Sequence, residues 1–334
     1  EMADALSFAG ANISKRVSNC YTSITTKMPN VFRAMYHAGN FISSNRHKSP
    51  VYLLNRLYQD AVLQYIQEHE ISFVVMPHLF PAQTMTALKR ERGVNIGTLA
   101  IATDYTCIPF WEETDIHHYV IPHQSLAREF YEKGIAKDKL LPFGIPVERA
   151  FFEKADRSSA RRALDLPLDQ PVFLIMSGSM GYGDLENLIC SYDGPAKLVV
   201  LCGRNEKLRL SLSKLRNDLC LVPFTQQVPL YMSASDVLFT KPGGLTSTEA
   251  AVHNIPLIHT RPIPGCETKN AEFYQNHKLS YYSKDIQSAL HFADHLMQDE
   301  VLRKEMLLAQ RATINPHARE QICDFILERA ACIG

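Results

Sequence analysis

Long hydrophobic runs are absent from these 334 residues. No stretch approaches the roughly 18 to 20 apolar residues that a membrane-spanning helix needs, and the first residues lack the basic and apolar regions of a signal peptide. Net charge is missing too, because 35 basic residues balance 35 acidic ones. Binding to nucleic acid is therefore not indicated, and any attraction to an anionic membrane must come from a local patch.

Clustered cysteines and metal-ligand motifs are also missing. The eight cysteines are scattered without a C-x-x-C pair, which is typical of reduced thiols in a cytoplasmic protein. There is no Asp-x-Asp pair, H-E-x-x-H motif, Walker A loop or G-x-S-x-G elbow, and His117 and His118 would point to opposite faces of a strand. We therefore expect no metal and no other cofactor.

What is present is an alternation of short apolar runs and segments with helical periodicity, in a composition that is 46% hydrophobic and 21% charged. The pattern predicts strands at 71–76, 96–103, 118–121, 140–143, 172–176, 198–202, 219–222, 237–240 and 257–258, with helices between them. One of these helices is expected over 51–69, and another from 83 to 92, ending at Gly93. Such alternation favours parallel sheets covered on both faces.

The length favours two domains, and Gly144-Ile-Pro-Val147 interrupts the alternation. We predict an α/β protein with two Rossmann-like, doubly wound domains facing a cleft. The expected ranges are 1–148, 149–314 and a C-terminal helix in 315–334 that packs back on the first domain. The chain opens at Glu1 on a patterned stretch, so we expect that an N-terminal strand and loop precede it.

The strongest local signal is Phe239-Thr-Lys-Pro-Gly-Gly-Leu-Thr-Ser-Thr-Glu-Ala250. A strand ends there in a Pro-Gly-Gly turn that opens a helix. Gly243 and Gly244 let the backbone approach a phosphate, and the helix N-terminus favours its negative charge. Glu249, early in this helix, could accept two ribose hydroxyls. An ordinary helix start, with Glu249 merely complementing the dipole, remains an equal alternative.

A second glycine-rich turn, with Gly178, Ser179 and Gly181, follows the strand at 172–176. It is weak evidence alone, but two such turns in one sheet point to a nucleotide. Glu267 and Asn270 share one helix face at an i, i+3 spacing and would suit sugar hydroxyls. Solvated side chains are the simpler interpretation of that pair.

In the first half, Asp104 and His78 follow neighbouring strands. Strand ends of this kind face a crevice, so the two side chains are candidate acid, base or acceptor-orienting groups, with purely structural roles as the alternative. Among the first 50 residues, Lys15, Arg16 and Arg33 occur with aromatic residues. They could form a patch for anionic lipid or a solvated helix face.

Together these motifs resemble the family of monogalactosyldiacylglycerol synthases and processive diacylglycerol glucosyltransferases, which have the GT-B fold. The resemblance covers nearly the whole chain. The motifs that carry it are Asp4-Ala-Leu6, Thr103-Asp104, Pro109-Phe-Trp-Glu-Glu113, Gly144-Ile-Pro-Val147, Gly178-Ser-Met-Gly181, Cys202-Gly-Arg-Asn205, Lys241-Pro-Gly-Gly244 and Glu249-Ala250.

The resemblance implies an inverting transfer of a hexose from a UDP-sugar to diacylglycerol or a glycosyl-diacylglycerol, by a cytoplasmic protein on the inner face of the cell membrane. The first domain would face the acceptor and membrane, and the second would bind the UDP-sugar. The implied donor contacts are Gly243, Gly244, Thr246 and Ser247 to the diphosphate, Glu249 to the ribose, Phe224 and Thr225 near the uracil, Glu267 and Asn270 to the sugar, and further Gly178, Ser179, Gly181 and Arg204. The implied acceptor or membrane contacts are Phe110, Trp111, Lys15, Arg16 and Arg33.

Three alternatives stay open. The donor sugar is undetermined, because this chain has Gly265-Cys266-Glu267 where many relatives have Gly-Gln-Glu. The N-acetylglucosaminyltransferase of peptidoglycan synthesis and UDP-sugar epimerases have similar folds. Relatives also carry an upstream strand and a Gly-x-Gly-His loop near the acceptor, and this sequence does not contain them. A catalytically silent UDP-sugar-binding protein is therefore the third interpretation.

Overall fold

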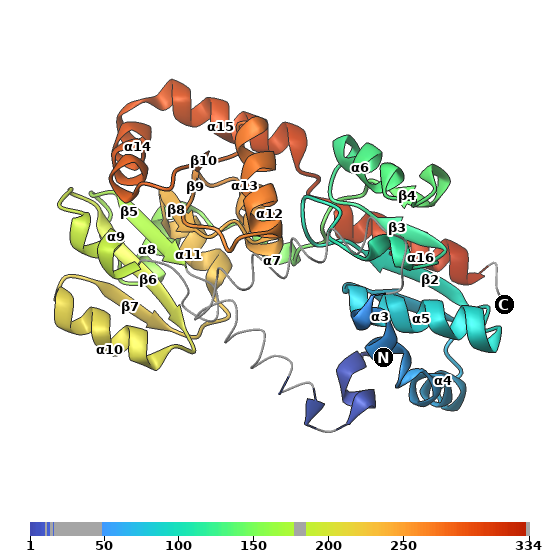
Figure 1. Ribbon diagram of the computed structural model, residues 1–334. Coiled ribbons are helices and arrows are strands. Elements are labelled where there is room, and N and C mark those ends of the chain that lie inside the picture. The colour runs from blue at the N-terminus through green and yellow to red at the C-terminus, as the bar shows by residue number, and fades with distance from the viewer. Residues whose placement is uncertain (11, 14–15, 17–48, 177–184, 332–334) are drawn as a thin grey trace. The chain divides into compact units, whose positions relative to one another are not determined.

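The computed structural model describes residues 1–10, 12, 13, 16, 49–176 and 185–331. The chain divides into two compact units (Figure 1). Unit 1 comprises Glu1–Pro146, Pro264–Cys266 and His317–Gly334, and unit 2 comprises Val147–Ile263 and Glu267–Pro316. The chain passes between the units at 146/147 and 316/317, two residues from the boundaries expected at 148/149 and 314/315, and also at 263/264 and 266/267, which were not expected.

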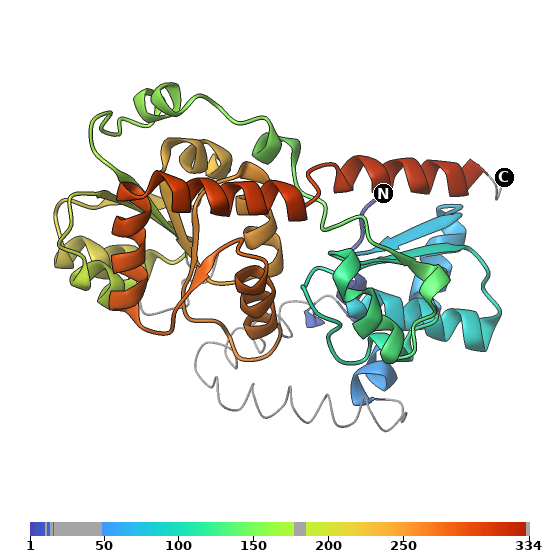
Figure 2. The same cartoon turned by 90° about the horizontal axis from the view of Figure 1, so that it is seen from above.

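Unit 1 is built on a parallel sheet in the order β1-β2-β3-β4. The strands are β1 (Phe73–Met76), β2 (Gly97–Ile101), β3 (His118–Val120) and β4 (Leu140–Leu141). Alternate residues of β2 point to opposite faces, as strand geometry requires. Ala100 belongs to the core under helix α5 (Leu79–Arg92), whereas Leu99 and Ile101 pack with Ile322 of helix α16 (Ala318–Ala331) (Figure 2). The C-terminal helix is thus part of unit 1.

Helix α5 shows both a confirmed and a corrected boundary. It ends at Gly93 in the left-handed conformation, with φ 68°, as expected for a glycine that terminates a helix. It begins earlier than predicted, at Leu79 after the N-cap residue His78, because Pro81 is tolerated in a first helical turn. The remaining elements of unit 1 are η1 (Ala5–Ala9), α3 (Pro50–Arg56), α4 (Gln59–Glu68), η2 (Trp111–Glu113), η3 (Gln124–Leu126), α6 (Ala127–Glu132) and η4 (Lys137–Lys139).

The prediction of one helix over 51–69 was wrong, because α3 and α4 are separate helices. The prediction counted Leu54 and Leu57 as a buried face, yet they are 63% and 80% exposed. Asn55 is buried instead. Its side chain donates to Gln83 Oε1 at 2.6 Å and accepts from the Tyr58 hydroxyl at 2.8 Å. A buried polar network, which hydrophobic periodicity does not detect, therefore sets how these helices lie.

Unit 2 is built on a six-stranded parallel sheet in the order β10-β9-β8-β5-β6-β7. The strands are β5 (Val172–Met176), β6 (Lys197–Gly203), β7 (Cys220–Pro223), β8 (Val237–Thr240), β9 (Leu257–His259) and β10 (Tyr281–Tyr282). Strands β6 and β7 follow in turn on one side of β5, and β8, β9 and β10 follow in turn on the other. This is the doubly wound order, and its switch point lies between β5 and β8.

Helices enclose this sheet (Figure 1). They are α7 (Arg149–Phe152), α8 (Arg157–Ala163), α9 (Leu185–Ser191), α10 (Glu206–Leu215), α11 (Val228–Ala234), α12 (Gly244–His253), α13 (Cys266–Asn276), α14 (Ile286–Gln298) and α15 (Glu300–Thr313). One core joins Phe173, Val200 and Phe239 of the sheet to α9, α10, α14 and α15. The predicted α/β fold with two Rossmann-like units is confirmed. The two-residue strand β10 was not predicted.

Candidate functional site

The switch point of unit 2 is the first feature that marks a site. Strands β5 and β8 pair in parallel up to Met176 and Thr240, so their carboxyl ends lie at the same edge. In doubly wound sheets this edge is where ligands bind. The hydroxyl of Thr240 is buried there, and within the described part of the chain it has no hydrogen-bond partner. A ligand bound at this edge could supply the missing hydrogen bond.

The turn after β8 leaves space beside the start of helix α12. Gly243 is the N-cap residue, with φ −73° and ψ 139°, and provides no capping side chain. A Cβ added at Gly243 would come no closer than 4.0 Å to another atom, Oε1 of Glu267. Neither the backbone conformation nor the packing of the protein itself demands glycine here. A ligand that approached the backbone closely, such as a phosphate at the positive end of α12, would favour glycine at this position.

Helix α13 holds this turn in place. The Lys241 ammonium lies 2.7 Å from Oε1 of Glu267, whose Oε2 accepts a hydrogen bond of 2.8 Å from the Ile263 amide. Asn270 donates to the Pro242 carbonyl at 3.0 Å. Glu267 and Asn270 are both buried, so the interpretation of these two as solvated side chains is wrong. Their contact with a donor sugar stays a prediction.

The structure corrects the role given to the Ser247 hydroxyl. Ser247 is fully buried, and its Oγ lies 2.9 Å from Nε2 of His259. Its amide is already bonded to the Gly243 carbonyl within the helix. His259 contacts the Ser280 hydroxyl through Nδ1, and burial lowers its pKa to about 3, so the ring is neutral. Ser247 and His259 therefore join α12 to the sheet, a role that no local pattern indicated.

Glu249 lies on the face of α12 that is not packed into the core. It is the sixth residue of the helix, close to the early position that was predicted, and it is half-buried with Thr246 one turn before it. Burial raises the pKa of Glu249 to about 7, and the negative charge of Glu148 adds to this increase. Ligand hydroxyls that donate hydrogen bonds to this carboxylate would stabilise its ionised form, which burial disfavours.

At the ends of β6 and β7 the structure brings two predicted donor residues together. The guanidinium of Arg204 lies 4.8 Å from the ring centre of Phe224, which is 53% exposed. An exposed aromatic ring with a cation on it can serve as a stacking platform for a base. The Thr225 hydroxyl accepts a hydrogen bond from the Gln227 amide. Gly178, Ser179 and Gly181 lie outside the described residues.

In unit 1, Asp104 and His78 lie at one edge of the sheet, because β1 and β2 run parallel and end beside each other. The Asp104 charge acts to raise the pKa of His78, but the stronger effect of desolvation at the ring lowers it below its usual value, although the residue as a whole is exposed. His78 Nδ1 accepts a hydrogen bond of 3.2 Å from the Phe80 amide and so caps α5. The neutral ring then carries its proton on Nε2, which makes it a donor rather than a base.

The prediction that Trp111 contacts the acceptor or membrane was wrong. Trp111 is only 3% exposed and packs edge-to-face on Tyr119, with the ring centres 6.1 Å apart, because the one large indole fills the core of unit 1. Phe110 beside it is half-buried and has φ 76°, a left-handed conformation that is costly for an aromatic residue. Arg16 is exposed. Lys15 and Arg33 lie outside the described residues.

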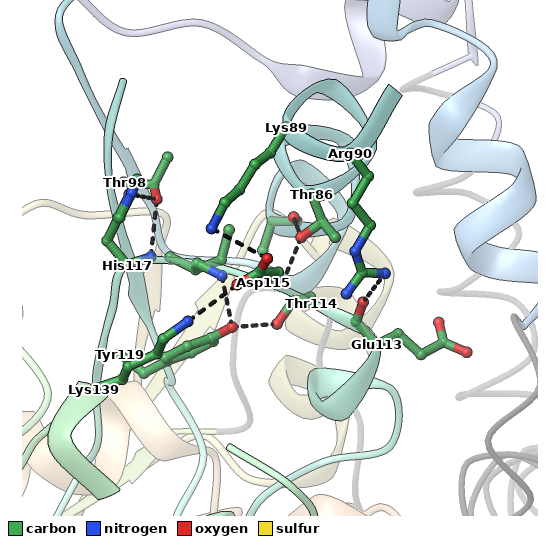
Figure 3. A network of polar contacts seen from close by, with 12 residues as sticks. Thr86, Lys89, Arg90, Thr98, Glu113, Thr114, Asp115, His117, Tyr119 and Lys139 are labelled. Carbon is green, nitrogen blue, oxygen red and sulfur yellow. Dashed lines mark hydrogen bonds and ion pairs between the residues drawn. The ribbon is translucent and has the colours of Figure 1, made fainter. Parts of the chain in front are cut away.

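The loop that starts with Asp104 is anchored at its far end by the contacts in Figure 3. Asp115 lies between two lysines, 3.1 Å from Lys89 and 3.0 Å from Lys139. Its amide donates to the Thr86 hydroxyl on α5 at 2.8 Å. The far end of the loop is therefore fixed to helix α5 and to η4.

A second anchor, which sequence reasoning missed, is Glu113. Its carboxylate accepts hydrogen bonds from the Ser49 amide at 2.6 Å, the Ser49 hydroxyl at 2.7 Å and Gln83 Nε2 at 2.8 Å. Burial raises the pKa of Glu113, and these donors oppose that effect. The carboxylate thus joins the start of α3, helix α5 and the Asp104 loop.

Across residues 49–176 and 185–331 and the described N-terminal residues, no three His, Cys, Asp or Glu side chains are grouped so as to hold a metal ion. In the same residues no helix has both the length and the apolar character to cross a bilayer. Metal independence therefore stays a prediction.

Comparison with known proteins confirms the resemblance. The family model of monogalactosyldiacylglycerol (MGDG) synthase matches residues 1–147. A processive diacylglycerol beta-glucosyltransferase of Staphylococcus saprophyticus is 28% identical over 255 residues, which are 74% of this chain but only 65% of that protein. The enzyme of the same name from Bacillus pumilus is 26% identical over 311 residues, 90% of this chain and 79% of the relative.

Among solved structures, Anabaena HepE in complex with UDP-glucose superposes with a TM-score of 0.57 at 12% identity, covering 81% of this chain and 82% of HepE. At that identity the likeness concerns the fold alone. The fold of this chain is that of the GT-B glycosyltransferases.

Proposed function

We propose that this chain transfers a hexose from a UDP-sugar to diacylglycerol, or to a glycosyl-diacylglycerol, at a membrane surface. The observation that carries the proposal is the Lys241-Pro-Gly-Gly turn, which lies at the switch point of unit 2 and opens helix α12. The relatives named as diacylglycerol glucosyltransferases support both the reaction and the acceptor class.

Unit 2 would bind the nucleotide. The diphosphate would lie at Gly243 and Gly244, a placement supported by the open surroundings of Gly243 and by the N–H groups of the helix N-terminus. Glu249 would accept the ribose hydroxyls, and Phe224 with Arg204 would stack on the uracil. HepE, which has the same fold, is known in complex with UDP-glucose.

Unit 1 would supply the acceptor side. Its main segment, Glu1–Pro146, coincides with the part of the chain matched by the MGDG synthase model. Asp104 is the proposed base, while His78, with its proton on Nε2, would orient the acceptor hydroxyl by donating to it. Lys15, Arg16 and Arg33 are proposed to contact anionic lipid on the inner face of the membrane, and nucleic acid is not a proposed partner.

The proposed reaction is a single displacement at C1 of the sugar. The acceptor hydroxyl oxygen forms a bond to C1, the bond from C1 to the diphosphate oxygen breaks, and the hydroxyl proton passes to Asp104. The UDP leaves with the bonding electron pair. Displacement from the opposite side inverts C1, in keeping with the beta products in the relatives' names. The N-terminus of α12 would stabilise the leaving diphosphate without a metal or other cofactor.

Mass spectrometry of lipid products tests this function. Diacylglycerol vesicles with added phosphatidylglycerol are incubated with the protein and UDP-glucose, UDP-galactose or UDP-N-acetylglucosamine. We expect hexosyl-diacylglycerol from one of the first two donors, undiminished by EDTA, and at least about a hundredfold less from Asp104→Asn. Hexosyl-diacylglycerol from neither of the first two donors, or UDP binding without any lipid product, would contradict the proposal.

A further inference from the structure

The ion pair of Lys241 and Glu267 differs from the surface ion pairs of unit 2. The Lys241 side chain is 21% exposed and that of Glu267 is 9% exposed, with 2.7 Å between Nζ and Oε1. By contrast, Lys269 and Glu272 on the same helix α13 form a pair at 2.9 Å whose side chains are 57% and 50% exposed. A pair so withdrawn from water loses much of its hydration, and only a well-defined geometry compensates for that loss.

The Glu267 carboxylate is held from both sides. Oε1 accepts from Lys241, and Oε2 accepts from the Ile263 amide at 2.8 Å. Each carboxylate oxygen has a second lone pair, and an ammonium has three N–H groups, of which this contact uses one. The pair thus keeps both acceptor and donor capacity, in a fixed direction.

The pair also lies beside the open space of the turn. Oε1 of Glu267 is 4.0 Å from the point where a Cβ of Gly243 would lie. A ligand whose diphosphate lies against Gly243 therefore brings its next group, the sugar, towards this carboxylate. Because the ammonium and carboxylate charges cancel, the pair suits a neutral group that both donates and accepts hydrogen bonds better than it suits an anion.

We propose that Lys241 is a positioning residue that sets donor-sugar selectivity, by fixing the Glu267 carboxylate against the hydroxyls of the hexose. This inference rests on the proposed function of the same site. A site built to hydrogen-bond a hydroxyl rejects a sugar that presents it differently, because buried polar groups are then left unpaired. Without Lys241, Oε1 loses its fixed direction and two hexoses that differ in one hydroxyl become similar substrates.

The test compares Lys241→Met, Lys241→Arg and the double variant Lys241→Met with Glu267→Gln, using Lys269→Met as the matched control on α13. Three quantities are measured. The first is the selectivity ratio, which is kcat/KM for the preferred donor divided by kcat/KM for the other, with UDP-glucose and UDP-galactose as the two donors. The others are the affinity for UDP alone and the melting temperature. We expect Lys241→Met to reduce the ratio at least about tenfold while UDP affinity changes by less than about twofold. Lys241→Arg should restore part of the ratio, and Lys269→Met should change nothing.

The double variant keeps the proposal testable if Lys241→Met alone fails to fold, since a neutral pair leaves no unpaired buried charge. It should fold and still lack selectivity. An unchanged ratio in a folded variant would overturn the proposal, and so would a tenfold loss of UDP affinity, which would make Lys241 a diphosphate ligand. Absence of UDP binding by the wild-type protein would instead refute the proposed function itself.

Discussion

The side-chain amide of Asn270 donates a hydrogen bond of 3.0 Å to the carbonyl of Pro242, so helix α13 holds the turn that opens helix α12. Asn270→Ala would leave this buried carbonyl unsatisfied, at a cost of about 1 to 3 kcal/mol. We expect a loss of that size in the free energy of unfolding, together with weaker UDP-sugar binding. Asn276→Ala, at the exposed end of α13, is the control. Unaltered binding by a destabilised Asn270→Ala would show that α13 does not shape the site.

Gly243→Ala should separate folding from binding. The backbone conformation of residue 243 is one that alanine adopts readily, and the new Cβ would have no neighbour closer than 4.0 Å. The melting temperature should therefore stay close to that of the wild type. UDP affinity should fall about tenfold or more, since the methyl group occupies the path of the diphosphate; this corresponds to about 1.4 kcal/mol.

Gly93→Ala provides the reciprocal control, because Gly93 has φ 68° and a substitution there is strained. It should cost about 1 to 2 kcal/mol of stability and leave UDP binding unchanged. If instead both variants bound UDP as tightly as the wild type, the diphosphate would not lie at the turn.

UDP-sugar affinity should depend on the protonation of Glu249. Ribose hydroxyls donate to the ionised carboxylate, whose pKa is raised to about 7 by burial and by Glu148. Affinity should therefore fall about eight- to tenfold from about pH 8 to about pH 6, as the ionised fraction falls. A UDP-sugar is the better ligand here, because it lacks the terminal phosphate that titrates near pH 6.

The same group affects stability in the opposite sense. Its pKa in the folded protein lies above the ordinary value of 4.5, so the folded state binds more protons between about pH 4.5 and about pH 7. Glu249 should lower stability as pH rises through that window. Glu249→Gln should remove its share of both trends, and Glu148→Gln should move the fall in affinity to lower pH. Identical pH profiles for wild type and Glu249→Gln would exclude Glu249 as the ribose ligand.

The single tryptophan gives a direct optical test of the membrane-facing residues. Trp111 is buried against Tyr119, so its emission should be blue-shifted and should not change when anionic vesicles are added. Brominated lipids should not quench it. Trp111→Ala should cost about 3 to 5 kcal/mol of stability, as expected of a core cavity. Quenching by brominated lipids would mean that this part of unit 1 opens on the membrane.

The sequence predicted best where one local rule decides the outcome. Alternating apolar runs located most strands, Gly93 located a helix end, and the Pro-Gly-Gly turn located the start of α12. It failed where distant polar groups decide. The break between α3 and α4 depends on the hydrogen bond from Asn55 to Gln83. The Ser247 hydroxyl is hydrogen-bonded to His259 on strand β9. Such contacts join residues that are far apart along the chain and leave no periodic trace.

The site was predicted in the same uneven way. Arg204 and Phe224 were assigned separately from resemblance, and the structure shows that their side chains meet. Trp111 was assigned to the acceptor or membrane side from the resemblance, but its side chain fills the core of unit 1. The anchoring role of Glu113 was invisible, since it depends on Ser49 and Gln83 reaching the same carboxylate.

The most direct test of the central claim, that the carboxyl edge of the unit 2 sheet binds UDP-sugar, is a calorimetric titration of UDP into wild-type protein and Glu249→Ala at about pH 8. We predict one UDP per chain for the wild type. We also predict a loss of about 1.5 to 3 kcal/mol, or roughly 10- to 150-fold in affinity, for a folded Glu249→Ala variant. Equal affinity of the two proteins, or no binding by the wild type, would contradict the central claim.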